Sequence, residues 1–297
     1  MTKIKSFSVG NGDMFYINHM NDNFTMIDCH LPDDDPSKKE LILSEVSKFK
    51  DKKGIHRFIS THPDQDHIGG LQDLDECIDI LNFYCVSNDT TKKDETEDFK
   101  HYKYLRDGAK SFHISRGCTR KWMNQSCSER NSSGVQILWP TLENSFYKEA
   151  LSKAHDGDSP NNISPIIKYS LDGGGTFLWM GDLDTEFMEN IKDEIDLPKV
   201  NVLFAPHHGR ESGRIPREWL EQMNPDIVVI GEAPSKNLHY YGDYKTLTQN
   251  SAKNLTFDLR KGVVNLYTGN PEYGVDFLKN NFLDDFGDDY YLGTLEL

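Results

Sequence analysis

The sequence has 297 residues, enough for one large α/β domain or two small ones, and its 11% aromatic content together with 12 prolines excludes an intrinsically disordered chain. The formal net charge is -15, which argues against a general binder of long duplex nucleic acid, because such proteins neutralise phosphates with lysine and arginine. A small phosphodiester substrate, or a nucleic acid held in a local groove, is compatible with this charge because metal ions would supply positive charge at the site.

The sequence shows no sign of a membrane or secretory segment. No apolar run approaches the roughly 20 residues that a membrane helix needs, and the N-terminus has no long apolar stretch before a small-residue cleavage site. No C-x-x-C pair is present, which favours reduced thiols over a disulfide or zinc site for Cys29, Cys77, Cys85, Cys118 and Cys127. These features predict a cytoplasmic protein without membrane contact.

The first elements of the chain read as a sheet with a helix beside it. Apolar residues in 3–9 and 13–18 flank Gly10-Asn11-Gly12, which predicts a hairpin. The apolar run 24–28 predicts a further strand that ends at an acid, Asp28. Residues 37–50 carry apolar side chains at helical spacing after Pro36, which predicts an amphipathic helix on one face of the sheet.

The stretch THPDQDHIGG, residues 61–70, follows the apolar pair Phe58-Ile59, which we interpret as the end of a buried strand. It contains four side chains that bind metals in many proteins, namely His62, Asp64, Asp66 and His67. A solvated loop would explain any one of them alone. Four within six residues, followed by two glycines, predict a loop that folds back so that their nitrogen and oxygen atoms converge on a metal.

The middle of the chain predicts a helix over 71–80, a strand over 81–86, an exposed helix within 88–111, and strands over 112–114 and 135–139. Between the last two strands lies a basic loop with Arg116, Arg120, Lys121 and Arg130. Two interpretations stay open for it, a solvated surface or a wall that steers an anionic substrate.

The second half predicts strands over 176–180, 200–204 and 227–230, a short helix over 216–223 and two closing strands between 256 and 267. The first of these strands ends near Asp182, and the second near His207 and His208. A histidine pair followed by glycine at a strand end is seldom a packing feature. Arg210 and Arg214 come soon afterwards and suit bidentate hydrogen bonds to phosphate.

The spacing His-x-Asp-x-Asp-His resembles the metallo-β-lactamase-fold signature His-x-His-x-Asp-His, with Asp64 where most members have the second histidine. The variant T-H-P-D-x-D-H-I-G-G resembles the hydrolase domain of ComEC-type competence proteins. The resemblance implies an α/β fold, an αββα sandwich of two mixed β-sheets flanked by helices, over residues 1–275. It leaves an acidic C-terminal tail, residues 276–297, for which two interpretations stay open, packing against the body of the domain or a contact with a partner or a second copy.

The resemblance also implies a set of site residues. Asp28 would support the metal loop from behind, Asp182 would bridge two ions, and further ligands would be His207 and His239 in addition to His62, Asp64, Asp66 and His67. At the place where most members have another histidine, the chain offers Asn161 and Asn162, with His155 upstream as an alternative.

The predicted function is that of a metal-dependent hydrolase with one or two divalent ions, zinc or manganese, acting on phosphodiester bonds of a nucleotide or nucleic acid. Asp66, His207 and His208 would be catalytic, and Asn162, Arg210 and Arg214 would bind the substrate. Two alternatives stay open, a metallo-hydrolase of a lactone, thioester or amide, and a degenerate binding protein without catalytic activity.

Overall fold

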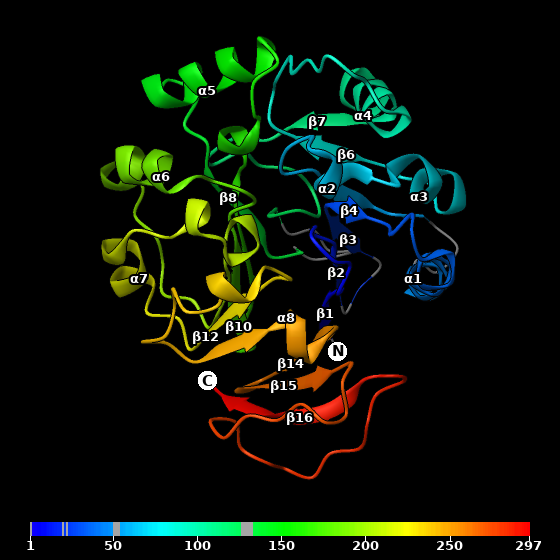
Figure 1. Ribbon diagram of the computed structural model, residues 1–297, viewed down its shortest axis with the longest axis vertical. Helices are drawn as coiled ribbons and strands as arrows, with labels where there is room; N and C mark the ends of the chain where they lie inside the picture. Colours follow the sequence, from blue (N-terminus) through cyan, green and yellow to red (C-terminus); the bar gives the residue numbers. More distant parts are fainter. Residues whose placement is uncertain (1, 20, 22, 50–53, 126–132) are drawn as a thin grey trace.

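The computed structural model describes residues 2–19, 21, 23–49, 54–125 and 133–297. Two β-sheets pack face to face and helices cover the two outer surfaces (Figure 1). Both sheets contain parallel and antiparallel neighbours. The predicted αββα sandwich of two mixed sheets is therefore confirmed.

The first sheet has nine strands in the order β16-β15-β14-β1-β2-β3-β5-β6-β7. Its strands from β16 to β3 are antiparallel neighbours, and those from β3 to β7 are parallel. The strands are β1 Thr2–Ser6, β2 Phe15–Asn18, β3 Phe24–Ile27, β5 Arg57–Ile59, β6 Phe83–Cys85, β7 Ser111–His113, β14 Leu255–Arg260, β15 Val263–Thr268 and β16 Tyr290–Glu296. The predicted hairpin between 3–9 and 13–18 is confirmed as β1 and β2.

The second sheet has six strands in the order β13-β12-β11-β10-β9-β8. Strands β10 to β13 are parallel to one another, whereas β8, β9 and β10 are antiparallel. The strands are β8 Val135–Trp139, β9 Ile166–Leu171, β10 Gly175–Trp179, β11 Val202–Phe204, β12 Ile227–Ile230 and β13 Thr246–Thr248. The short strand β4, Cys29–His30, pairs only through bridges to Ile68 and Gly69 among the described residues.

Helices α1, α3 and α4 cover the first sheet, and α5, α6 and α7 cover the second (Figure 1). The helices are α1 Pro36–Phe49, α2 Gln65–Ile68, α3 Leu71–Cys77, α4 Glu97–Asp107, α5 Ser145–His155, α6 Thr185–Ile191, α7 Arg217–Met223 and α8 Gln249–Ala252. In the described part of the chain, none of these helices has the length and apolar character needed to cross a membrane.

The alternation of side chains along β2 shows how the layers are held together. Phe15 and Ile17 point into the core between the two sheets, whereas Tyr16 belongs to the second core under α1, α3 and α4. Phe15 meets Trp179 of β10 and Phe204 of β11 edge-on, with ring centroids 6.1 and 4.9 Å apart. These contacts hold the amino end of β2 next to the carboxyl ends of β10 and β11.

The basic loop does not form a free cationic wall in its described part. Arg116 donates a hydrogen bond to the carbonyl of Glu194 at 2.9 Å, and Arg120 lies over the rings of Tyr84 and Phe112. Both arginines therefore have structural contacts at the ends of the sheets. Lys121 is exposed, and Arg130 lies outside the described residues.

The C-terminal segment 276–297 contributes strand β16 to the edge of the first sheet. Its Asp289 is buried and accepts hydrogen bonds from Lys5 Nζ at 3.0 Å and from Thr256 Oγ1 at 2.7 Å. Lys5 is also buried and contacts Glu45 at 2.9 Å. A buried ion pair thus fixes the segment to β1.

Replacing Asp289 with alanine is expected to lower the free energy of unfolding by about 3 kcal/mol, because the buried Lys5 ammonium then loses one of its two carboxylate partners. Urea denaturation measures the change. The control Asp288→Ala removes an exposed neighbouring carboxylate, and equal stability of the two variants would show that the Lys5 pair does not fix the segment.

Candidate metal centre

The centre lies where strands from both sheets end. His62 and His67 follow β5, Asp182 follows β10, and His208 follows β11. The turn between β1 and β2 adds Asp13. The sandwich therefore brings residues from four distant parts of the sequence to one edge.

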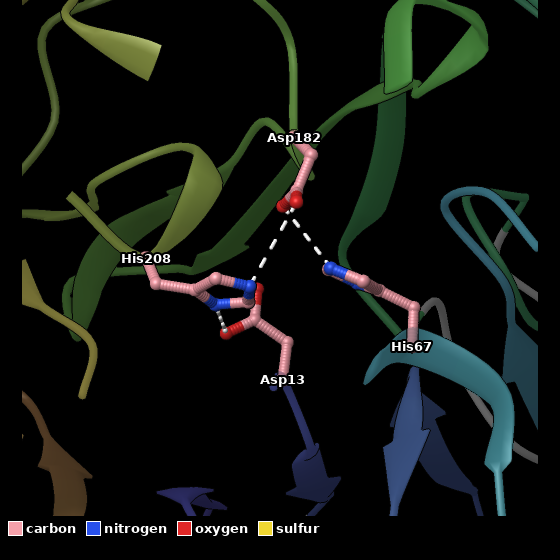
Figure 2. A group of neighbouring side chains, drawn as sticks. All are labelled: Asp13, His67, Asp182 and His208. Atoms are coloured by element: carbon pink, nitrogen blue, oxygen red, sulfur yellow. Dashed lines mark hydrogen bonds and ion pairs between the residues drawn. The ribbon is translucent and has the colours of Figure 1, made fainter. Parts of the chain in front are cut away.

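The inner cluster consists of Asp13, His67, Asp182 and His208, each of which offers one ligand atom, and these atoms lie within 4.8 Å of one another. Figure 2 shows Asp182 facing both imidazoles. His67 Nε2 lies 3.1 Å from Asp182 Oδ1, and His208 Nε2 lies 3.7 Å from Asp182 Oδ2. The Asp182 carboxylate is thus shared between imidazoles from the two halves of the chain.

Four further side chains extend the cluster. Asp66 Oδ2 is 3.5 Å from His208 Nε2, and His62 Nε2 is 3.7 Å from Asp64 Oδ2. His62 Nε2 and His207 Nε2 lie 4.0 and 3.6 Å from Asp182 Oδ2. The arrangement offers two groups of donors around Asp182, one with Asp66, His67 and His208 and the other with His62 and Asp64.

The hydrogen bonds of the imidazoles leave their Nε2 atoms available. His67 Nδ1 lies 2.9 Å from Asp28 Oδ2, His208 Nδ1 lies 3.0 Å from Asp13 Oδ1, and His62 Nδ1 lies 3.2 Å from Ser164 Oγ. A donor role for each Nδ1–H leaves a lone pair on Nε2, the form that binds metals.

The unsatisfied polar atoms show that the residues fit a metal. In the described part of the chain, Nε2 of His62, His67 and His208 and Oδ1 of Asp182 are buried and form no hydrogen bond of good geometry, although His67 Nε2 lies 3.1 Å from Asp182 Oδ1. Buried polar atoms are rarely left in this way because each costs about 1–3 kcal/mol. Divalent cations at the two groups of donors would satisfy these atoms, and a set of imidazole nitrogens with carboxylate oxygens suits zinc, iron or manganese.

The charges of the centre also favour a cation. Burial lowers the pKa of His62 to about 4. Burial acts in the same direction on His208, but the carboxylates of Asp13 and Asp182 outweigh it and raise the pKa of that residue to about 10. Burial would raise the pKa of Asp182, yet His67 and His208 hold it well below its ordinary value. The carboxylates thus draw positive charge into a buried place.

The backbone at the histidine pair is strained. His207 and His208 have φ angles of 51° and 55°, in the left-handed region that non-glycine residues rarely adopt. Two such residues in succession cost of the order of 1 kcal/mol each or more, and such strain is concentrated at functional sites. This conformation places the His207 and His208 imidazoles on the Asp182 carboxylate.

Asp28 lies behind the centre, as the family resemblance implied. It is buried and accepts hydrogen bonds from the backbone N–H of Thr61 at 2.7 Å and from Thr61 Oγ1 at 2.6 Å. Together with its contact to His67 Nδ1, these bonds orient the metal loop from the rear.

Replacing Asp28 with asparagine is expected to weaken metal affinity about 10- to 100-fold, because His67 loses the carboxylate that fixes its orientation. Competition with a chelator of known affinity measures the change. Unchanged metal affinity in a folded variant would rule out this role.

His239 requires a correction. The structure places it in an exposed segment, where its ring packs on Tyr240 with centroids 4.4 Å apart. The chain passes His208 at Gly231, directly after β12, and the following residues 235–240 lead away to the outer surface beside Arg214 and α7. We therefore replace His239 with His208 as the ligand from the second half.

The asparagines take structural positions. Asn162 donates to Asp184 Oδ2 and accepts from the backbone N–H of Asp184, both at 2.9 Å, so it braces the loop that carries Asp182. Asn161 accepts from Ser159 Oγ at 2.7 Å. His155 ends helix α5 and its Nδ1 lies 3.3 Å from the carbonyl of Asp89. At this part of the site it is Ser164, beside His62, that contacts the cluster.

Arg210 and Arg214, both predicted to bind the substrate, lie at different distances from the centre. Arg210 follows the histidine pair and contacts Asn11 Oδ1 beside the β1–β2 turn, and its buried Nε has no partner among the described residues. Arg214 is exposed and lies 5.9 Å from the Tyr240 ring on the outer surface. Of the two, Arg210 is the one adjacent to the centre.

Sequence reasoning missed Asp13 and Lys92. Asp13 approaches because Gly12 has no side chain, and a Cβ there would lie 2.6 Å from the carbonyl oxygen of Asp66. Asp13 directly follows Gly10-Asn11-Gly12 in the turn of the predicted hairpin, and an acid at that position could have been considered as a metal ligand. Lys92 forms an ion pair with Asp64, and no spacing in the sequence linked these two residues.

Comparison with known proteins finds one curated relative and several solved structures that are similar to this chain. ComE operon protein 3 of Bacillus subtilis is 24% identical over 205 residues, which cover 68% of this chain but 23% of that protein. The chain thus spans about a quarter of the length of this curated relative. No family model matches the chain.

Among solved structures, the metallo-β-lactamase fold protein YhfI from Bacillus subtilis is 10% identical, with a TM-score of 0.43 and coverage of 83% of this chain and 95% of that chain. The novel metallo hydrolase Igni18 from Ignicoccus hospitalis is 15% identical, with a TM-score of 0.47 and coverage of 87% and 100%. The chain resembles metallo-β-lactamase-fold proteins and a ComE operon protein, as its motifs predicted.

Proposed function

We propose that this protein is a metal-dependent hydrolase. The observation that carries the proposal is the convergence of three buried, unpartnered imidazole Nε2 atoms on the Asp182 carboxylate. A degenerate binding protein would have no reason to keep these atoms unsatisfied, since each costs stability. Igni18, to which the chain is similar, is itself described as a metallo hydrolase.

The proposed substrate is a phosphodiester of a nucleotide or nucleic acid. The oxygen-rich donor set supports a hard cation such as manganese as well as zinc. Arg210 and Lys92 place cationic groups beside the centre of an otherwise acidic chain. The cytoplasmic location and a contact through residues 276–297 stay predictions.

Different side chains of the centre would have different roles in catalysis. When bound, one or two divalent ions would lower the pKa of a water molecule and supply positive charge to the reacting group. Asp66, part of whose side chain reaches solvent, would orient that water. His207 is the most exposed of the four clustered histidines, with 15% of its side chain accessible, and Ser212 Oγ lies 2.9 Å from its Nδ1. It therefore suits proton donation to the leaving oxygen, whereas the buried His208 suits a ligand role.

The test combines metal analysis with a substrate panel. Purified protein is analysed for bound metal and assayed with and without manganese or zinc. The substrates are bis-p-nitrophenyl phosphate, single-stranded and duplex DNA, RNA and cyclic dinucleotides, together with a lactone, a thioester and an amide. Metal-dependent release of p-nitrophenolate or nucleotide is expected. Bound metal with hydrolysis of lactones, thioesters or amides alone would favour the rival hydrolase, and a protein that binds no metal would favour the degenerate one.

A further inference from the structure

Lys92 is the cationic side chain that the site brings to the metal loop. It comes from the segment between β6 and α4, and its Nζ forms an ion pair with Asp64 Oδ1. The ammonium also lies 5.9 Å from the centroid of the Phe99 ring at the start of α4. About a quarter of each side chain is accessible, 28% for Lys92 and 25% for Asp64, so the pair sits at the mouth of the centre.

The charge of the centre makes this cation important. Six carboxylates contact the clustered histidines, namely those of Asp13, Asp28, Asp64, Asp66, Asp182 and Asp184. Their combined charge exceeds the positive charge of two divalent ions, so a loaded centre has no net positive charge with which to attract an anion. Asp64, at a position where the resemblance implies a neutral histidine ligand, adds to this negative charge. An anionic substrate then depends on cationic side chains at the rim.

The Lys92 ammonium carries three N–H groups. It donates a hydrogen bond to Asp64 Oδ1, which leaves N–H groups for a further acceptor. When Asp64 shares its charge with a cation, its hold on Lys92 weakens, and the accessible ammonium can donate to an oxygen of the substrate. The Phe99 ring and the ion pair keep Nζ at the mouth in the meantime.

We propose that Lys92 is a substrate-binding residue that donates to a non-bridging oxygen of an anionic phosphodiester and so selects anionic substrates over neutral ones. The inference rests on the proposed hydrolase function and names the chemistry that the substrate must have. Arg210 lies on the side of Asp13 and His208, whereas Lys92 lies on the side of His62 and Asp64. The two cations therefore contact different parts of the centre's surroundings, Arg210 at Asn11 and Lys92 at Asp64.

The test uses Lys92→Met, which keeps the length of the side chain and removes the charge, and Lys92→Arg, which keeps the charge. Lys93→Met removes the exposed neighbouring charge and is the matched control. Four quantities are measured on metal-loaded protein: bound metal, the dissociation constant of dimethyl phosphate by calorimetry, and kcat and KM for bis-p-nitrophenyl phosphate.

For Lys92→Met we expect unchanged metal content, and a rise of about 10- to 100-fold in both the dimethyl phosphate dissociation constant and KM, since a charged hydrogen bond to phosphate is lost. Lys92→Arg should restore most of the affinity, and Lys93→Met should match the wild type. Unchanged dissociation constant and KM in Lys92→Met would overturn the inference. So would a loss of metal that accounts for the whole effect, because Lys92 would then act only by holding Asp64.

The same measurements separate this inference from the proposed function. Lys92-dependent binding of dimethyl phosphate without hydrolysis of any phosphodiester would refute the proposed function and support the role of Lys92 in anion binding. Hydrolysis with the same KM in wild type and Lys92→Met would support the function and refute the role of Lys92. A metal-loaded wild-type protein that does not bind dimethyl phosphate would also refute the role of Lys92 in substrate binding.

Discussion

Replacing Asp182 with asparagine is expected to remove most bound metal and to lower the hydrolytic rate by about a thousandfold or more. Asp182 Oδ2 lies 3.6, 3.7 and 4.0 Å from Nε2 of His207, His208 and His62, and Oδ1 lies 3.1 Å from that of His67. Asparagine keeps the shape but removes the charge shared by these groups. The loss corresponds to several kcal/mol of transition-state stabilisation.

The control for this variant is Asp172→Asn, which neutralises an exposed acid in the turn between β9 and β10. Metal content by mass spectrometry, rates on bis-p-nitrophenyl phosphate and a circular dichroism melt are compared for the two proteins. A folded Asp182→Asn protein with wild-type metal content and rate would show that Asp182 does not hold the ions.

The second large effect separates His208 from His239. His208→Ala should lose metal and about a hundredfold or more in rate, because a buried nitrogen that faces Asp66 and Asp182 is removed. His239→Ala should change neither quantity by more than about twofold, as expected for an exposed side chain outside the cluster.

His207→Ala adds a diagnostic comparison. A general acid can be removed while metal remains, and its loss matters less for a substrate with a good leaving group such as p-nitrophenolate. We expect this variant to keep metal and to lose more activity on a nucleic-acid phosphodiester than on bis-p-nitrophenyl phosphate. Metal loss from His239→Ala together with full metal in His208→Ala would reverse our assignment of the ligands.

The part of the centre that comes from one loop could be predicted from the sequence, because its metal-binding side chains are close together in the chain. His62, Asp64, Asp66 and His67 lie within six consecutive positions after a buried strand, and the structure brings them to Asp182 and His208. Asp13 could not be found in this way. It contacts His208 across 195 residues, and that approach depends on how the two sheets pack.

The error at His239 and the omission of helix α5 have different causes. His239 was assigned by resemblance alone, in a segment whose neighbours departed from the family pattern, and packing takes that segment to the surface. Helix α5 had local signals, since Asn144 caps it by accepting from the Tyr147 N–H, and Tyr147, Ala150 and Ala154 form its buried face. From the sequence we assigned no element to residues 145–155, although these signals were present there.

The most direct test of metal binding at Asp182 is anomalous X-ray diffraction from crystals of the protein grown with zinc or manganese. We expect one or two anomalous peaks beside Asp182, with ligand bonds to Nε2 of His67 and His208, and with Asp13 and Asp28 behind those imidazoles. An absence of any peak at Asp182 in a fully folded protein, or a peak at His239 instead, would contradict this expectation.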